Sequence, residues 1–237
     1  MTATPVVIKL GGSLAVPTAP SGEELTVGTS APPAAAEPLT HVHTRPEGGS
    51  APLSRWLGVI AEAARPVVIV PGGGAFADTV RSEQKRLGFS DEAAHFMAIL
   101  AMHQTGTMLL DMQPRRLVPA STEAELRGAL GRGDIPVWMA LGMVIADPHL
   151  PRDWSVTSDG LAAWLALQLR IPEVWLVKSR TAAADTTLSA LASEGVVDPV
   201  FADLAGRAGL SWRVFGPGQE QALLGALAAP AGSVPDA

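Results

Sequence analysis

VVIKLGGS, residues 6–13, is an apolar run of strand type that carries one lysine near its end and stops at two glycines and a serine. Lysine is rarely buried without a partner, so its place in this strand requires an explanation. Glycine adopts backbone conformations that other residues avoid and lets a ligand approach the main chain closely. We therefore predict that Lys9 lies at the carboxyl end of a buried strand, followed by a loop of Gly11, Gly12 and Ser13.

The order of strand, glycine loop and helix occurs a second time further along the chain. Residues 67–70 read VVIV, residues 71–74 read PGGG, and residues 75–87 have helical spacing. A third apolar strand, residues 174–177, is closed by Lys178-Ser179. Three predicted strands thus end in glycine, lysine or serine rather than in an ordinary turn.

The remaining elements alternate in the same way. We expect further strands at residues 116–119, 135–139 and 212–215. We expect helices at residues 53–64, 121–130 and 219–228, a helix that begins at Ser90, and a helix that runs to residue 170 with Ser158 as its N-cap. Short apolar strands that alternate with helices indicate an α/β protein with a mostly parallel sheet covered on both faces.

Composition narrows the class of protein. The chain has 237 residues, 47% hydrophobic and 5% aromatic, which fits one large α/β domain or two small ones with an aliphatic core. We expect a single domain over residues 1–237. The formal net charge of −6 and the lack of a basic run argue against a nucleic-acid partner. Without cysteine there is no disulfide, thiolate metal site or cysteine nucleophile. No apolar stretch suits a membrane span and no signal peptide is recognisable, so we expect a cytoplasmic protein without a membrane partner.

Residues 16–52 differ from the rest in being rich in Pro, Ala, Ser, Thr and Gly without helical or strand period. We interpret them as an insertion or mobile loop of the domain. His41 and His43 lie in it at a spacing that suits a metal, although an isolated pair in a loop usually binds none.

The three strand ends predict where the chemistry lies. Ligands of open parallel sheets bind beyond the carboxyl ends of the strands, and successive N–H groups in glycine loops form a concavity for anions. Two such loops and two lysines suit a polyanion, and phosphate is the obvious one. Neither a P-loop nor a G-x-G-x-x-G dinucleotide pattern is present, so tight turns without a ligand remain the alternative.

KLGGS after the first strand, PGGG after the second, and SDGLAA before the LVKS strand resemble the motifs of the amino acid kinase family, in the order that this family has them. The resemblance spans residues 5–179. It implies a three-layer αβα sandwich with a mostly parallel sheet (the carbamate kinase-like fold), ATP and Mg²⁺ as cofactors, and a homo-oligomer, dimer or higher.

The same resemblance assigns roles to individual residues. Lys9 would stabilise the transferring phosphoryl group, Asp159 would orient the lysines, and Lys178 would contact ATP phosphates; the alternative for Asp159 is a charge that complements a helix dipole. The residues expected to hold the nucleotide are Gly11, Gly12, Ser13 and Ser179. The residues expected to cradle the acceptor are Gly72, Gly73 and Gly74.

Three further residues are candidates for the acceptor pocket. Arg81 follows the PGGG loop on a predicted helix and could grip a phosphate in a bidentate way. Asp78 could pair with Arg81 or bind a substrate amine, and His95 could reach the pocket from the next helix. A solvated arginine and a hydrogen-bonded core histidine are the alternatives. Trp154 precedes the loop before Ser158 and is a candidate to line the same pocket.

A narrower resemblance concerns the acceptor. The runs GGGAFADTVR, FSDEAAHFMAILAMHQTG, DWSVTSDGLAAWLA and VVDPVF are similar to the [5-(aminomethyl)furan-3-yl]methyl phosphate kinase branch of methanofuran and methylofuran biosynthesis. This implies an ATP-dependent kinase that turns a small phosphate monoester into a diphosphate. Uridylate kinase and isopentenyl phosphate kinase are alternatives within the same chemistry.

The sequence departs from the family after Lys178. Many relatives continue with an aspartate and a D-G-[VI] turn, where this chain has Ser179-Arg180-Thr181. A non-catalytic nucleotide sensor or oxoanion store on the same fold is therefore a further alternative. Retention of Lys9, Asp159 and Lys178 favours the enzyme.

Overall fold

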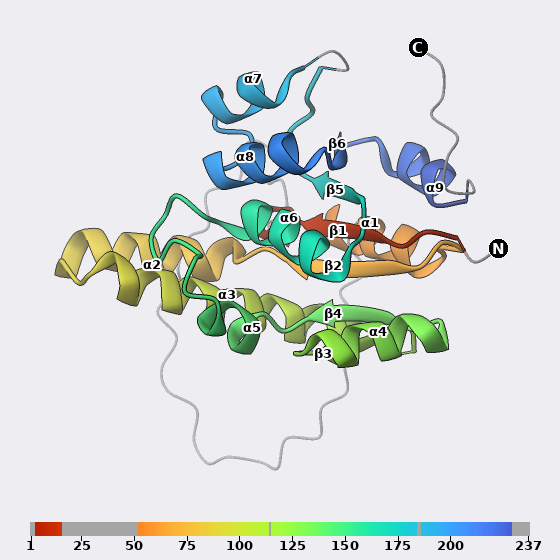
Figure 1. Ribbon diagram of the computed structural model, residues 1–237, viewed down its shortest axis with the longest axis horizontal. Helices are drawn as coiled ribbons and strands as arrows, with labels where there is room; N and C mark the ends of the chain where they lie inside the picture. The colour runs from red at the N-terminus through yellow and green to blue at the C-terminus, as the bar shows by residue number, and fades with distance from the viewer. Residues whose placement is uncertain (1–2, 16–51, 114, 184–185, 229–237) are drawn as a thin grey trace, which may run out of the picture.

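A parallel sheet forms the centre of the chain in the computed structural model, which describes residues 3–15, 52–113, 115–183 and 186–228. The sheet is six-stranded, in the order β3-β4-β2-β1-β5-β6, and every described pairing is parallel (Figure 1). The strands are β1 (Val6–Leu10), β2 (Val67–Pro71), β3 (Leu117–Ala120), β4 (Ile135–Trp138), β5 (Glu173–Val177) and β6 (Ser211–Phe215). All strands predicted from the sequence are present.

Helices cover both faces of this sheet, which confirms the predicted three-layer αβα sandwich (Figure 1). One face packs against α4, α6 and α8, and the other against α1 and α9. The helical segments are η1 (Gly12–Ala15), α1 (Pro52–Ala61), α2 (Gly74–Leu87), α3 (Asp91–Met112), α4 (Glu123–Arg132), α5 (Leu141–Ala146), α6 (Ser158–Leu169), α7 (Leu188–Ser193), α8 (Pro199–Ala208) and α9 (Glu220–Ala228).

The central strand β1 explains why its sequence is continuously apolar. All its residues are buried, since helices lie on both sides of it. Val6, Ile8 and Leu10 join the core under α1, whereas Val7 joins the core under α6. Successive side chains of a strand point to opposite faces, so Lys9 shares the α6 side of the sheet with Val7.

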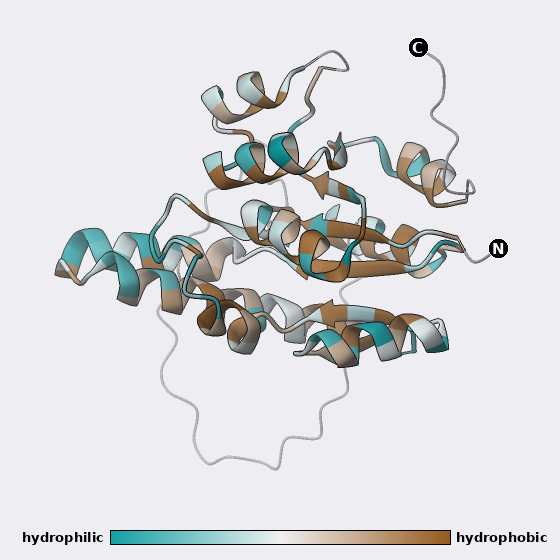
Figure 2. Cartoon of the chain, in the orientation of Figure 1, coloured by the Kyte–Doolittle hydropathy of each residue, from teal (hydrophilic) through white to brown (hydrophobic). Residues whose placement is uncertain are grey.

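Helix α2 differs from the buried helices. It is largely hydrophilic and buries only Val80 among its residues (Figure 2). None of the helices in the described ranges is long and apolar enough to cross a membrane.

Some elements differ from the predictions. The structure contains α5, α7 and α8, which the sequence pattern did not predict. The predicted cap of α6 is wrong by one residue, because Thr157 is the N-cap and Ser158 is the first helical residue. The Thr157 hydroxyl does not cap its own helix and donates to Asp198 instead. The predicted insertion at 16–52, with His41 and His43, lies outside the described residues except for Pro52, which is the first residue of α1 rather than part of a loop.

Candidate functional site

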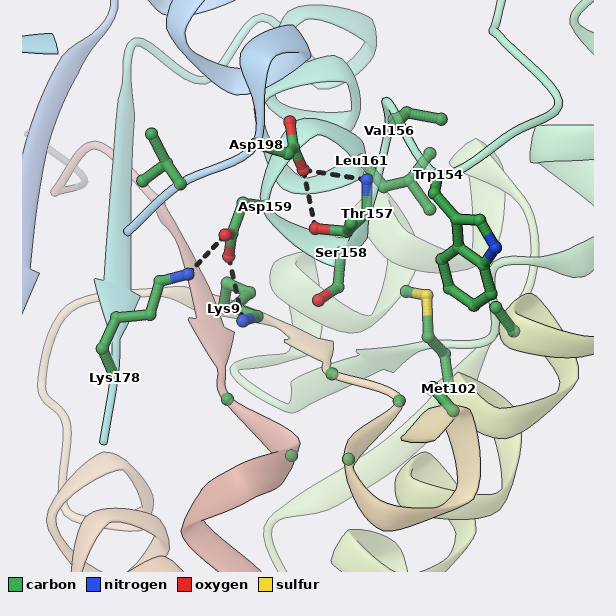
Figure 3. A pocket seen from close by; sticks show the side chains of 18 of the residues that line it. Lys9, Met102, Trp154, Val156, Thr157, Ser158, Asp159, Leu161, Lys178 and Asp198 are labelled. Atoms are coloured by element: carbon green, nitrogen blue, oxygen red, sulfur yellow. Dashed lines mark hydrogen bonds and ion pairs between the residues drawn. The ribbon is translucent and has the colours of Figure 1, made fainter. Parts of the chain in front are cut away.

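A cavity of about 600 Å³ opens at the carboxyl edge of the sheet, between the loops that follow β1, β2 and β5 and the start of α6 (Figure 3). This is where ligands of parallel sheets bind. The site residues predicted from the sequence that line it are Lys9, Gly11, Gly12, Gly72, Gly73, Gly74, Asp78, Arg81, His95, Asp159, Lys178 and Ser179. Ser13 lies in η1.

Lys9 enters this cavity from the floor. It is only 6% exposed, and its side chain lies on the α6 side of β1. Helix α6 packs across β1, so that its first turn reaches the carboxyl end of the strand. Lys9 Nζ lies 2.9 Å from Asp159 Oδ1 in that first turn. A carboxylate partner therefore explains how a lysine is tolerated in a buried strand.

Lys178 reaches the same carboxylate from the neighbouring strand. It directly follows β5, on the side of Leu176, which packs in the core under α6. Its Nζ donates a hydrogen bond to Asp159 Oδ2, so each oxygen of Asp159 faces one lysine (Figure 3). The chain has only one other lysine, Lys85, which is exposed on α2.

The three charges alter one another's protonation. Burial alone would raise the pKa of the Asp159 carboxyl, but the charges of Lys9 and Lys178 outweigh it and hold this pKa below its ordinary value. Burial, assisted by the charge of Lys9, lowers the pKa of Lys178 to about 8 against the opposing effect of Asp159. Lys178 is thus a cation near neutral pH that can lose its proton in mildly alkaline solution.

The two glycine loops are packed against each other as well as lining the cavity. A Cβ added at Gly12 would lie 2.1 Å from Gly74 N, and one at Gly72 would lie 2.6 Å from Gly12 N. Gly74 also has a positive φ of 53°, which favours glycine. The glycines therefore allow the backbones of the two loops to approach each other closely, apart from any role in binding a ligand. This contact fixes the separation of the two loops.

A second group of side chains lines the cavity at its α2 and α3 side. The Arg81 guanidinium lies 4.2 Å from the centre of the Trp154 ring, and Trp154 Nε1 donates to Gln84 Oε1 at 2.7 Å. Asp78 is exposed on α2, and His95 is buried on α3. The sequence allowed an ion pair between Asp78 and Arg81. Among the described residues these two side chains do not form one, and Arg81 packs on Trp154 instead.

The histidines of α3 have different partners. His103 Nε2 accepts a hydrogen bond from Leu141 N at 2.9 Å, at the start of α5. Burial lowers the pKa of His95, although the backbone carbonyl and charge of Asp153 oppose this. His95 therefore stays a neutral group in the cavity wall near pH 7.

The sequence reasoning missed Asp198. This carboxylate is 8% exposed, lines the cavity, and accepts hydrogen bonds from Thr157 and Gly160 in the α6 turn that carries Asp159. Burial and the nearby charge of Asp159 raise its pKa. The dipeptide Asp198-Pro199 was the available signal, since aspartate at the N-cap followed by proline commonly begins a helix.

Within the described ranges, no three histidine or acidic side chains are grouped so that they could hold a metal ion. The cavity is lined by the cationic side chains of Lys9, Arg81, Lys178 and Arg180 and by the carboxylates of Asp78, Asp159 and Asp198. The lysines and arginines of this lining suit anionic groups.

Comparisons with known proteins relate the chain to kinases. No family model matches the chain. It is 26% identical over 110 residues to the [5-(aminomethyl)furan-3-yl]methyl phosphate kinase of Methanocaldococcus jannaschii, a match that covers 46% of this chain and 50% of that protein. The chain thus matches about half the length of this curated relative.

Solved structures of uridylate kinases have the same fold. The kinase of Archaeoglobus fulgidus aligns with a TM-score of 0.61 and 16% identity over 94% of each chain. That of Bacillus anthracis gives 0.62 and 16% identity, covering 95% of this chain and 93% of its own. That of Ureaplasma parvum gives 0.63 and 14%, covering 96% and 93%. The predicted resemblance to the amino acid kinase family, and to its aminomethylfuran phosphate branch, is confirmed, and at this identity the solved structures establish the fold.

Proposed function

We propose that this chain is an ATP-dependent kinase that transfers a phosphoryl group to a small phosphate monoester. The observation that carries the proposal is the pair Lys9 and Lys178 held on Asp159 at the edge where the two glycine loops meet. Phosphoryl transfer requires positioning and electrostatic stabilisation more than covalent chemistry by the protein. Two preplaced ammonium groups supply this.

In this proposal the lysines have separate tasks. Lys9 lies at the end of β1, between the glycine loops, and faces the phosphoryl group as it moves from donor to acceptor. Lys178 lies beside Ser179 and contacts the nucleotide phosphates. An oxygen of the acceptor phosphate forms the new bond to the γ-phosphorus while the bond to the ADP oxygen breaks. Because this oxygen is already anionic, no protein base is needed.

The charges of the site explain why a divalent cation is proposed as well. Asp159 lies between Lys9 and Lys178 and Asp198 lies nearby, so these carboxylates offset much of the positive charge of the two lysines. ATP and a phosphate monoester would bring several negative charges together. Mg²⁺ commonly binds through substrate phosphates and water rather than a protein cage, so we propose that it enters with the nucleotide.

Aminomethylfuran phosphate is the acceptor that we propose. The curated relative is named for this substrate, and the α2 side of the cavity has complementary groups. Arg81 supplies a guanidinium for the phosphate, Trp154 a flat wall for an aromatic ring, and Asp78 a carboxylate for the amine.

ADP release from the purified protein with ATP and Mg²⁺ tests this assignment, with aminomethylfuran phosphate, UMP and isopentenyl phosphate compared as acceptors. We expect turnover with the furan phosphate and little with the others. Turnover with another acceptor would overturn the substrate but not the chemistry. Nucleotide binding without turnover on any acceptor would favour the sensor or storage alternative.

We also propose a homo-oligomer. Phe96 and Leu100 on α3 and Ile145 on α5 are large apolar side chains that remain exposed in the single chain. Light scattering on the purified protein measures the mass directly. A monomer at micromolar concentration would contradict this part of the proposal.

A further inference from the structure

Asp198 connects two helices through one carboxylate. Its Oδ2 accepts hydrogen bonds from Thr157 N at 2.8 Å, Thr157 Oγ1 at 2.7 Å and Gly160 N at 2.8 Å, all at the beginning of α6. Its Oδ1 accepts from Phe201 N at 2.7 Å, which caps the beginning of α8. The start of α6 is therefore fixed from a segment about forty residues away in sequence.

Gly160 has a packing reason that involves the same carboxylate. A Cβ added at Gly160 would lie 2.7 Å from Asp198 Oδ1. The glycine that follows Asp159 thus allows Asp198 to approach the α6 backbone. In the sequence SDG, Asp159 pairs with the two lysines, and Gly160 leaves room for the carboxylate of Asp198.

A helix cap alone does not require this arrangement. The caps of α3, α4 and α7 are the exposed hydroxyl residues Ser90, Thr122 and Thr187. Asp198 is instead a buried carboxylate placed near a second carboxylate, Asp159, which is electrostatically unfavourable. Its negative charge acts on Lys178 together with that of Asp159.

We propose that Asp198 is a positioning residue that holds the first turn of α6 in place and thereby fixes Asp159 between Lys9 and Lys178. Its effect on catalysis rests on the proposed kinase function, whereas its effect on the lysines does not. If the carboxylate is neutralised, Asp159 loses its fixed orientation and Lys178 loses a nearby negative charge.

Lysine NMR on the full chain tests the positioning directly. With ¹³C-labelled lysine, the Cε signals of Lys9, Lys85 and Lys178 are followed through a pH titration in wild type and Asp198→Asn. The charged groups that act on Lys178 are Lys9, Asp159 and Asp198, so loss of one carboxylate should lower its pKa below the wild-type value of about 8. Exposed Lys85 is the internal reference.

Steady-state kinetics with the best acceptor give the catalytic effect. We expect Asp198→Asn to reduce kcat by about 10- to 100-fold, with KM values nearly unchanged, because the reacting groups are misplaced rather than removed. Thr157→Val, which removes one donor and keeps the carboxylate, should reduce kcat less, and Thr157→Ser should restore it. These variants keep the test valid if Asp198→Asn fails to fold.

Thr122→Ala is the matched control. It removes a helix cap at α4, beside the edge strand β3, which β4 and β2 separate from β1. We expect it to lower stability by a cap's usual amount and leave kcat and the Lys178 titration unchanged.

The possible outcomes separate the two claims. An unchanged Lys178 titration and an unchanged kcat in Asp198→Asn would overturn the positioning role. A shifted titration in a protein that turns over no acceptor would support the positioning role and refute the proposed kinase function.

Discussion

Gly12→Ala is the substitution whose consequence the structure defines most closely. The new Cβ would lie 2.1 Å from Gly74 N and 2.2 Å from Gly74 Cα, both backbone atoms. Nonbonded heavy atoms prefer a separation of about 3.5 Å, so the two glycine loops have to part by about 1 Å or more. No side-chain rotation can relieve this contact.

The expected cost has two parts. Moving two packed backbone segments destabilises a protein by about 1–3 kcal/mol. A displacement of about 1 Å between the groups that position donor and acceptor reduces kcat by about 100-fold. We expect both effects, in urea unfolding and in coupled ADP release with the best acceptor.

Gly58→Ala is the control for a glycine without a close neighbour. Gly58 lies in α1, and a Cβ there would meet no side chain or backbone atom within 4 Å beyond the adjacent backbone of its own helix. Alanine should stabilise the helix by up to about 1 kcal/mol and leave turnover unchanged. If Gly12→Ala retained wild-type stability and turnover, the loop contact would not constrain the site and the reasoning would be refuted.

Three further predictions follow from the described contacts. The kcat should fall as pH rises through about 8, where Lys178 loses its proton, and a pH profile of Lys178→Arg should lack this alkaline fall because arginine stays charged. Arg65→Met should cost about 1–3 kcal/mol in urea unfolding, since it removes a buried guanidinium that lies 2.5 Å from half-buried Glu173, and a double change of both residues should recover part of the loss. Trp154→Ala should raise the acceptor KM by about 5- to 30-fold in steady-state assays, because Arg81 loses the ring that orients it; an unchanged KM would argue against this wall of the cavity.

The sheet was predictable because its strands are buried on both faces. A short, uninterrupted apolar run is typical of a strand that is buried on both faces. The strands β1, β2 and β5 could therefore be predicted from local sequence. Lys9 was informative for the same reason. A charge in such a run needs a partner, and the partner, Asp159, lies in a helix that crosses the strand.

The positions of the glycine loops were predicted from the sequence, but only one of the two reasons for their glycines was. The sequence suggested room for a ligand, whereas Gly12 and Gly74 also make room for each other. That contact joins segments about sixty residues apart, and no local pattern indicates which backbone atoms will meet across such a distance.

Asp198 was not predicted from the sequence, whereas Trp154 lines the cavity as the sequence suggested and only its hydrogen-bond partner was not predicted. Both depend on long-range hydrogen bonds, from Thr157 to Asp198 and from Trp154 to Gln84. Helix α8 went unpredicted, although Asp198-Pro199 is a recognisable helix start. The residues that bind the lysines were thus predictable by motif, and those that position them were not.

Turnover of Lys9→Met with ATP, Mg²⁺ and the best acceptor tests the central claim most directly. Methionine keeps the shape of the buried side chain and removes the charge, while Lys178 still pairs with Asp159. We predict a loss of kcat of about 100-fold or more with folding and nucleotide binding retained. A variant that turned over within a few-fold of wild type would contradict the claim that Lys9 stabilises the transferring phosphoryl group.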